Sequence, residues 1–350
     1  MSIVYHERPG VYSDYTASSV SASGERSKVL ALIGVSDAEV GLYTVTSYSD
    51  GAAAFGDGSE LGKMLAAAYK NGAGTVLAYS IAEDTAENYQ AAIDAVMAEK
   101  AAAFCAVGSV SEAVQQMLKR AVLEASASGG ECIGIVGLNA PEKNALLARA
   151  AALDCERMVL VGPDAYRSGE SELCGGAVCA SSLCGLLAAQ TDPALPLNGA
   201  VVSGLSGVSA SYDDTEIDAL VQGGVTVLTA VSGTVRILRG ITTRQTIGEG
   251  RDTTYRELNT ILVIDDVIPG VRSALGARFP RAKNNAATRS AIRSQVIVEL
   301  DSRVSREIID SYGDVTVEAS STDASTCLVS FSFTVMRGLN RIWLTAHISV

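Results

Sequence analysis

Short apolar runs that alternate with helical segments constrain the fold of this chain most. Five runs have the length of strands and lack the in–out alternation of a strand with one wet face: Val29–Val35, Thr75–Ile81, Ala102–Val107, Cys132–Val136 and Met158–Val161. Helices are predicted between and after them, at residues 60–70, 85–100, 111–127, 142–153 and 171–190. Strands buried on both faces are typical of a parallel sheet covered by helices. The sequence predicts a doubly wound α/β domain of about five strands, over residues 25–200.

Residues 173–191 carry no charge and resemble a membrane span in that respect. They are rich in Gly, Ala, Ser and Cys and hold few large apolar side chains, which favours a buried helix.

The pattern changes after Pro193 and Pro196, and the rest of the chain is predicted to be α+β. Asp213-Asp214 precedes a short helix, with Asp213 placed to cap it. Residues 254–275 are predicted to be one helix interrupted at Pro269-Gly270, or two elements. The other expected elements are a helix over residues 284–310 and the strands Val225–Ala230, Val235–Leu238, Val315–Ala319 and Cys327–Val335. This half defines a second domain, residues 201–340.

Both ends of the chain have the character of strands without a partner. Residues 341–350 alternate apolar and polar side chains and contain the chain's one Trp. Residues 1–24 begin with apolar strand-like pieces and continue as a small, polar linker. Ends of this kind suit strand addition to a neighbouring copy. The predicted contact residues of these two arms are Val4, Tyr5, Val11, Tyr12, Ile342, Trp343, Leu344 and Ile348.

The chain has a formal net charge of −12, most of it in the first 200 residues. An acidic surface argues against nucleic acid as a partner. Basic residues of the second half are almost all Arg, which favours contact with protein. Lys283, Arg289 and Arg293 lie on or near the helix predicted at 284–310, with Arg303 and Arg306 further along. One interpretation is that these basic residues contact another protein. The alternative is that the helix faces solvent and its charges pair with one another, as Arg303 could with Glu307.

Seven Cys, an odd number, and the absence of an apolar leader favour a reduced, cytoplasmic site of assembly. Cys174, Cys179 and Cys184 recur every five residues. On one helix that spacing turns the side chains about 140° apart, so we expect packing and no metal site.

No catalytic, cofactor-binding or metal residue is predicted. Gly56–Lys63 resembles a phosphate loop, but only three residues separate Gly58 from Gly62 and Met64 follows the Lys. Asp265-Asp266 suits a solvated turn or a salt bridge better than acid/base work. The two His, His6 and His347, lie in the arms, which disfavours a His-based site. The open alternative is an α/β nucleotide-binding protein or enzyme using Gly56–Lys63.

Several segments, taken in order, resemble the contractile tail sheath family of bacteriophages, which includes the sheaths of R-type bacteriocins and other injection particles. The similar segments are Arg8–Tyr12, Ser49–Gly72, Gly176–Gly199, Glu216–Thr243, Tyr255–Pro269, Lys283–Arg289 and Arg341–Thr345.

The resemblance implies a structural subunit that polymerises as stacked hexameric rings around an inner tube. It implies an outer α/β domain, a C-terminal domain against the tube, and arms that join the sheets of neighbouring subunits. Lys283, Arg289 and Arg293 become candidates for contact with the tube. The implied partners are other sheath subunits, the tube protein, and baseplate and tail terminator proteins. The implied location is a virion tail or a released phage-tail-like particle.

Overall fold

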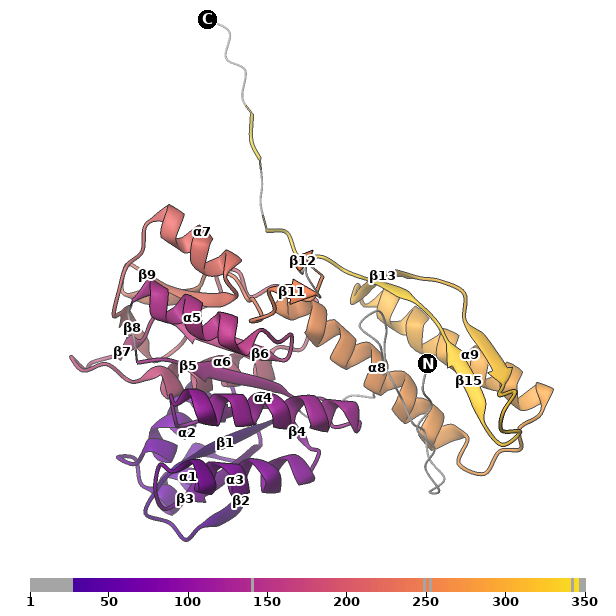
Figure 1. The fold of residues 1–350 in the computed structure, drawn as a ribbon, viewed down its shortest axis with the longest axis horizontal. Helices are drawn as coiled ribbons and strands as arrows, with labels where there is room; N and C mark the ends of the chain where they lie inside the picture. Colours follow the sequence, from indigo (N-terminus) through magenta and orange to yellow (C-terminus); the bar gives the residue numbers. More distant parts are fainter. Residues whose placement is uncertain (1–27, 140–141, 248–249, 252–253, 341–342, 346–350) are drawn as a thin grey trace, which may run out of the picture.

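A computed structural model describes residues 28–139, 142–247, 250–251, 254–340 and 343–345 of the chain (Figure 1). Its largest element is an eight-stranded sheet in the order β10-β9-β6-β5-β4-β1-β3-β2. The inner strands run parallel, and the edge strands β2 and β10 pair antiparallel to their neighbours. The strands are β1 Val29–Val35, β2 Gly41–Val45, β3 Val76–Ile81, β4 Ala102–Val107, β5 Ile133–Gly137, β6 Met158–Gly162, β9 Val225–Val231 and β10 Thr234–Ile237.

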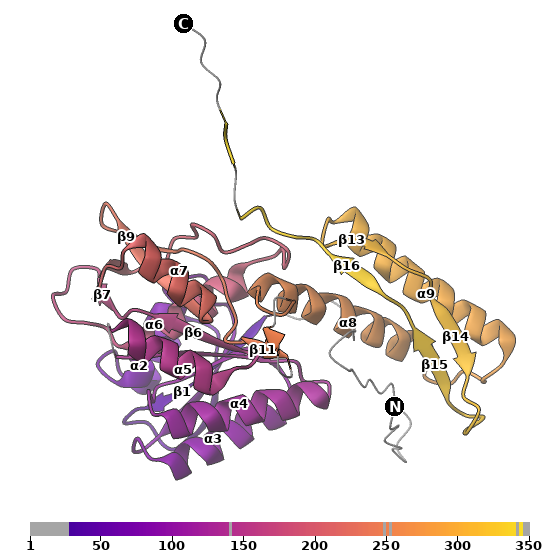
Figure 2. The same ribbon diagram turned by 45° about the horizontal axis from the view of Figure 1, so that its top comes forward.

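Helices cover both faces of this sheet (Figures 1 and 2). One face packs against α1, α2, α6 and the start of α8 in one apolar core, and the other packs against α3, α4, α5 and α7 in a second core. Side chains at the N-cap positions Ser47, Ser59, Thr85 and Asp213 accept a hydrogen bond from the first turn of their helices. The helices are α1 Tyr48–Phe55, α2 Glu60–Lys70, α3 Ala86–Ala98, α4 Glu112–Ala127, α5 Lys143–Leu153, α6 Gly176–Ala189 and α7 Asp214–Gln222.

The sheet has eight strands, so the prediction of about five is wrong. Strand β2 and helix α1 were not predicted. Strands β9 and β10 were predicted, but were assigned to the second domain. In the structure β9 pairs with β6, so both strands belong to the large sheet. The local sequence pattern predicts a strand, but it does not predict which distant strand will pair with it.

Helix α6 is the buried helix predicted from the uncharged segment, and it begins at Gly176 instead of residue 171. Gly175, directly before the helix, has φ +87°, a backbone conformation that favours glycine. This residue separates the preceding extended segment from the helix. Side chains on Gly176 or Gly185 would collide with the backbone at Leu138 or Ala68, so α6 packs very closely against its neighbours. Within the described residues no helix has the length and apolarity needed to cross a membrane.

Helix α8, Leu258–Arg278, is a single helix that contains Pro269. The predicted interruption is therefore wrong, although the proline removes one backbone hydrogen bond. Leu258 and Ile261 lie in the core beneath the sheet, whereas Val271 and Leu275 lie in a third core. The helix is continuous through the proline, and both of its ends are buried.

The third core belongs to a C-terminal unit in which α9, Ala286–Ser305, packs on α8 and on two strand pairs. Strand β13, Ile309–Tyr312, pairs with β16, Phe333–Val335, and β14, Thr316–Ala319, pairs with β15, Cys327–Ser330. The helix predicted to reach residue 310 ends earlier, and Glu307 turns the chain with φ +57°. The single strand predicted over Cys327–Val335 is two strands. Two further short pairs are β7 Ala165–Arg167 with β8 Leu205–Val208, and β11 Thr246–Ile247 with β12 Gly250–Arg251.

Ion pairs fasten α8 to the sheet domain. Arg157, just before β6, donates two hydrogen bonds of 2.8 Å to the carboxylate of Asp265. Near the other end, Arg272 donates to Glu131 at 2.6 Å. The Arg157 side chain is only 4% exposed, so this pair lies almost entirely out of water. The sheet domain and the C-terminal unit are thus joined by one helix with charged contacts along it.

We predict that Arg157→Met will lower the free energy of unfolding by about 3 kcal/mol, because the partly buried Asp265 carboxylate loses the charge and the two hydrogen bonds of Arg157. The double variant Arg157→Met/Asp265→Leu should recover most of this loss. Chemical denaturation measures both.

Arg167→Met is the matched control, since its pair with Glu170 is more exposed and should contribute about 0.5 kcal/mol. Equal effects at the two arginines would contradict the special role of the Arg157–Asp265 pair.

Candidate assembly interface

The four C-terminal strands form two antiparallel pairs, β13–β16 and β14–β15, which lie one after the other on α9 (Figure 2). We call these two pairs together the ribbon. Its side chains alternate. Val317, Val329 and Phe333 pack inward against the third core, while Glu318 and Leu328 are exposed on the other face. Period-two alternation over one buried face is what fixes the register of such a ribbon.

Both edges of this ribbon are unpaired within the described residues, because each of the four strands has a single partner. A strand edge presents a row of backbone N–H and C=O groups that can pair with another chain. Two strands with one covered face also lie at the lower limit of what is stable alone. The geometry favours a surface that accepts additional strands.

The chain leaves the ribbon and passes over the sheet domain before its end. Asn198 donates a 2.7 Å hydrogen bond from its side chain to that of Asn340. A side chain on Gly338 would meet the ring of Pro196, so the chain lies close to the surface there. These contacts fix the point from which the C-terminal arm departs.

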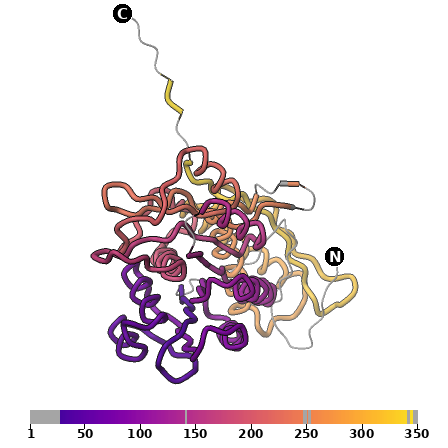
Figure 3. The backbone as a smooth tube through the Cα atoms, turned by 60° about the vertical axis from the view of Figure 1, so that its left-hand side comes forward, coloured from indigo at the N-terminus to yellow at the C-terminus, as the bar shows by residue number. Residues whose placement is uncertain are grey.

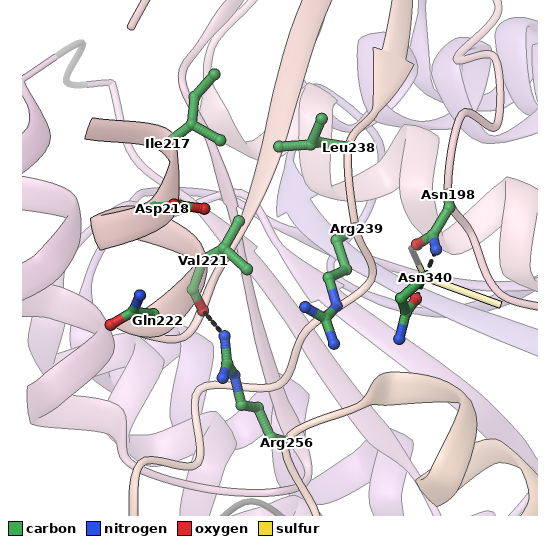
Figure 4. Close-up of a pocket in the computed structure, with 9 residues that line it drawn as sticks. All are labelled: Asn198, Ile217, Asp218, Val221, Gln222, Leu238, Arg239, Arg256 and Asn340. Atoms are coloured by element: carbon green, nitrogen blue, oxygen red, sulfur yellow. Dashed lines mark hydrogen bonds between the residues drawn. The ribbon is translucent and has the colours of Figure 1, made fainter. Parts of the chain in front are cut away.

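A hollow of about 450 Å³ lies beside this departure point (Figure 4). Ile217 and Val221 of α7 line one side, with Leu238 and Arg239 on the other. Arg239 forms an ion pair with Glu257. Arg256 donates to the backbone carbonyl of Val221 at 2.9 Å. Its two arginines are thus held by groups of this chain, and the hollow is an open recess at the base of the arm.

Of the eight predicted arm contacts, the structure describes two. Trp343 and Leu344 are 91% and 87% exposed and lie outside any strand of this single chain. The short described segment that contains them, residues 343–345, stands away from the rest of the molecule in all three views (Figure 3). Val4, Tyr5, Val11, Tyr12, Ile342 and Ile348 lie outside the described residues, as do His6 and His347. Two large apolar side chains in open solvent are the expected state of an arm that has no neighbour.

The basic residues in α9 and just before it divide into two groups. Lys283 and Arg293 are exposed, and Arg289 is half-buried with its guanidinium donating to Asn284 at 2.9 Å. Asn284 in turn donates to backbone carbonyls of the β14–β15 hairpin, so Lys283, Asn284 and Arg289 lie at the hairpin end of the C-terminal unit. Arg293 lies one turn further along α9 and donates from Nε to the carbonyl of Val315 at 2.8 Å.

Arg303 was included among the possible contact residues, and the structure contradicts this. Its side chain is buried and pairs with Glu299 at 2.6 Å and with Asp266 at 3.3 Å. The partner expected from the sequence, Glu307, lies beyond the helix end. Asp265 and Asp266 are both salt-bridge partners, and Asp213 caps α7, as predicted.

The loop Gly56–Lys63 does not form a phosphate cradle. Ser59 caps α2 by accepting from the Gly62 N–H at 2.9 Å. The Glu60 carboxylate accepts from the N–H of Val35, the last residue of β1, at 3.0 Å. An anion at the carboxyl end of β1 would meet this carboxylate at the place where α/β sheets bind ligands. The nucleotide-binding alternative therefore loses its site.

Cys184 lies apart from Cys174 and Cys179, as predicted, but the helical argument fails for Cys174, which precedes α6. The sulfur atoms of Cys174 and Cys179 are 3.7 Å apart, and each lies 3.8 Å from the Asp164 carboxylate. Burial raises the pKa of Asp164. The hydrogen bond with Cys174, together with burial, raises the pKa of the Cys179 thiol. Sequence spacing could not reveal this cluster, because Asp164 comes from a different segment.

Comparison with known proteins places these features in a family. Residues 82–243 match the model of the phage tail sheath protein central domain, and residues 251–349 match that of the phage tail sheath C-terminal domain. These segments contain most of the large sheet and the whole ribbon.

A tail sheath protein of Bacillus phage SP01 is 31% identical over 216 residues, which are 59% of this chain and 36% of that protein. The chain thus matches about a third of the length of that relative.

Solved structures share the fold. A chain of the anti-feeding prophage baseplate superimposes with a TM-score of 0.75 at 15% identity, covering 99% of this chain and 100% of that one. A chain of the anti-feeding prophage helical sheath in its contracted state gives a TM-score of 0.70 at 15% identity, with the same coverage. With its central and C-terminal domains both matched, this chain belongs to the phage tail sheath protein family, whose members are structural proteins and not enzymes.

Proposed function

We propose that this chain is the subunit of a contractile tail sheath, which polymerises as stacked hexameric rings around an inner tube and drives that tube through a bacterial envelope. The observation that carries the proposal is the ribbon of β13–β16, whose two edges are unpaired within the described residues. Membership of the sheath family supports it.

The arms supply the missing strands. Ten extended residues reach about 33 Å and the N-terminal 24 reach about 80 Å, enough for each arm to meet a neighbour's ribbon. Backbone hydrogen bonds of added strands give affinity, and alternating side chains such as Ile342, Leu344 and Ile348 give register. Each subunit would give arms to some copies and receive arms from others. Such heterologous contacts, which do not close on themselves, build helical stacks.

Contraction on this scheme needs no bound nucleotide. The extended lattice is metastable, and better contacts between subunits in the contracted lattice supply the energy. The ion pairs along α8 support movement of each subunit as one rigid piece, while the arms act as tethers. The doubly wound domain, with β9 and β10 included in it, would face outward.

The C-terminal unit would face the tube. Lys283 and Arg289, at its hairpin end, and Arg293, one turn further along α9, are suited to an acidic tube surface. Assembly would occur in the bacterial cytoplasm, with baseplate and terminator proteins at the two ends of the sheath. The finished polymer would form a virion tail or part of a released phage-tail-like particle.

We predict that removal of residues 341–350 will leave a folded protein that no longer polymerises, because the donated strand is lost. Circular dichroism and thermal unfolding should match the full chain, and electron microscopy should show neither tubes nor ring stacks.

Leu173→Ser is the control, since Leu173 is also a large exposed apolar residue but lies outside the arms and the ribbon. It should assemble normally. Normal sheath from the truncated chain would rule out the C-terminal arm as a tether.

We predict that Lys283→Glu/Arg293→Glu will weaken binding to the tube protein about tenfold through repulsion between like charges. This pair leaves Arg289 and its bond to Asn284 in place, and removes one hydrogen bond within the chain, from Arg293 Nε to the carbonyl of Val315. Co-sedimentation of the tube with purified sheath protein measures the effect. Lys63→Glu, an equally exposed reversal on α2, should change nothing, and an equal loss there would indicate general electrostatics instead of a tube contact.

A further inference from the structure

Asp164, Cys174 and Cys179 bring three metal-ligating atoms together from three separate segments. Asp164 lies in the turn after β6, Cys174 precedes α6, and Cys179 lies in its second turn. Each sulfur is 3.8 Å from Oδ1 of Asp164, and the two sulfurs are 3.7 Å apart. The triangle is nearly equilateral.

The backbone around these residues holds the triangle in place. The N–H of Cys174 donates to the carbonyl of Ala165 at 2.8 Å, and the N–H of Ser209 donates to the carbonyl of Asp164 at 2.7 Å. Asn139 accepts from the N–H of Gly176 at 2.7 Å, which fixes the start of α6. Asp164 and Cys179 are 3% and 2% exposed, while Cys174 is half-buried and gives access to solvent.

The triangle has the dimensions of one face of a zinc tetrahedron. A point equidistant from three atoms this far apart lies about 2.2 Å from each in their plane, and slightly above the plane it reaches the Zn–S distance of about 2.3 Å. No side chain has to move far for all three atoms to reach one ion.

From this geometry we infer that Asp164, Cys174 and Cys179 form a binding site for a thiophilic divalent cation of the zinc class. Two thiolates select soft or borderline ions over Mg²⁺ and Ca²⁺, and a carboxylate oxygen completes a set that zinc accepts. On binding, each thiol releases its proton to solvent. Three protein ligands leave a fourth position for water.

The bound ion would join the turn after β6 to the first turns of α6, the most deeply buried helix of the sheet domain. It would act as a structural clamp, independent of the proposed assembly of the chain.

Cobalt titration of the reduced, purified full-length chain under anaerobic conditions tests the site, with Co²⁺ as a coloured substitute for zinc. The expected result is a stoichiometric sulfur-to-cobalt charge-transfer absorption, displaced by added Zn²⁺. Cys179→Ser should lose this absorption. Cys184→Ser, another buried cysteine of α6, should keep it.

A second readout is stability. Removing zinc with a chelator should lower the midpoint of thermal unfolding for the parent chain and leave that of Cys179→Ser unchanged. If Cys179→Ser does not fold, Cys174→Ser serves instead, since its side chain is half-buried. The site is refuted if the folded, reduced chain gives no charge-transfer absorption. An unchanged absorption in the folded variant, or a Cys174–Cys179 disulfide in protein purified without oxidant, also refutes it.

Discussion

The insertion of α8 into two apolar cores is the constraint on which the rest of the structure depends. Its first turns complete the core beneath the large sheet, and its last turns complete the core shared with α9 and the ribbon. The pairs of Arg157 with Asp265 and of Arg272 with Glu131 fix its position from the side of the sheet. Each such pair compensates charges that would be costly to bury alone. A tilt of the C-terminal unit against the sheet domain would therefore disturb both cores and both ion pairs together.

The ribbon differs from α8, because contacts within the described part of the chain fix only one of its faces. Its inward side chains are fixed by α9, while its outer edges have no partner among the described residues. A rigid body that carries an incomplete sheet, with apolar residues such as Trp343 held out in solvent, is well suited to a lattice whose subunits move without separating.

How much could be read from sequence depended on how local the determining contacts are. The buried strands and the capped helices of the sheet domain were predicted, because burial on both faces and capping residues leave a local pattern. Membership of β9 and β10 in that sheet was missed, since strand pairing is decided by packing between distant segments.

Pro269 predicts an interruption locally, yet burial at both ends of α8 outweighs one lost hydrogen bond. The helical-spacing argument was applied to Cys174, but Cys174 lies before the helix. Gly175, with its positive φ, separates the two. Arg303 was a plausible surface charge until α8 placed Asp266 beside it.

Open ribbon edges and outgoing arms also make the two ends of any such polymer chemically different. In the interior every edge can be filled by an arm from a neighbour. At one terminus the last subunits would expose vacant edges, and at the other they would expose arms with nowhere to insert. Growth of the proposed lattice would then be directional, because a subunit arriving at one end would receive strands and a subunit arriving at the other end would donate them. The polarity of the whole tail would thus originate in the asymmetry between a two-stranded ribbon and the peptide that completes it.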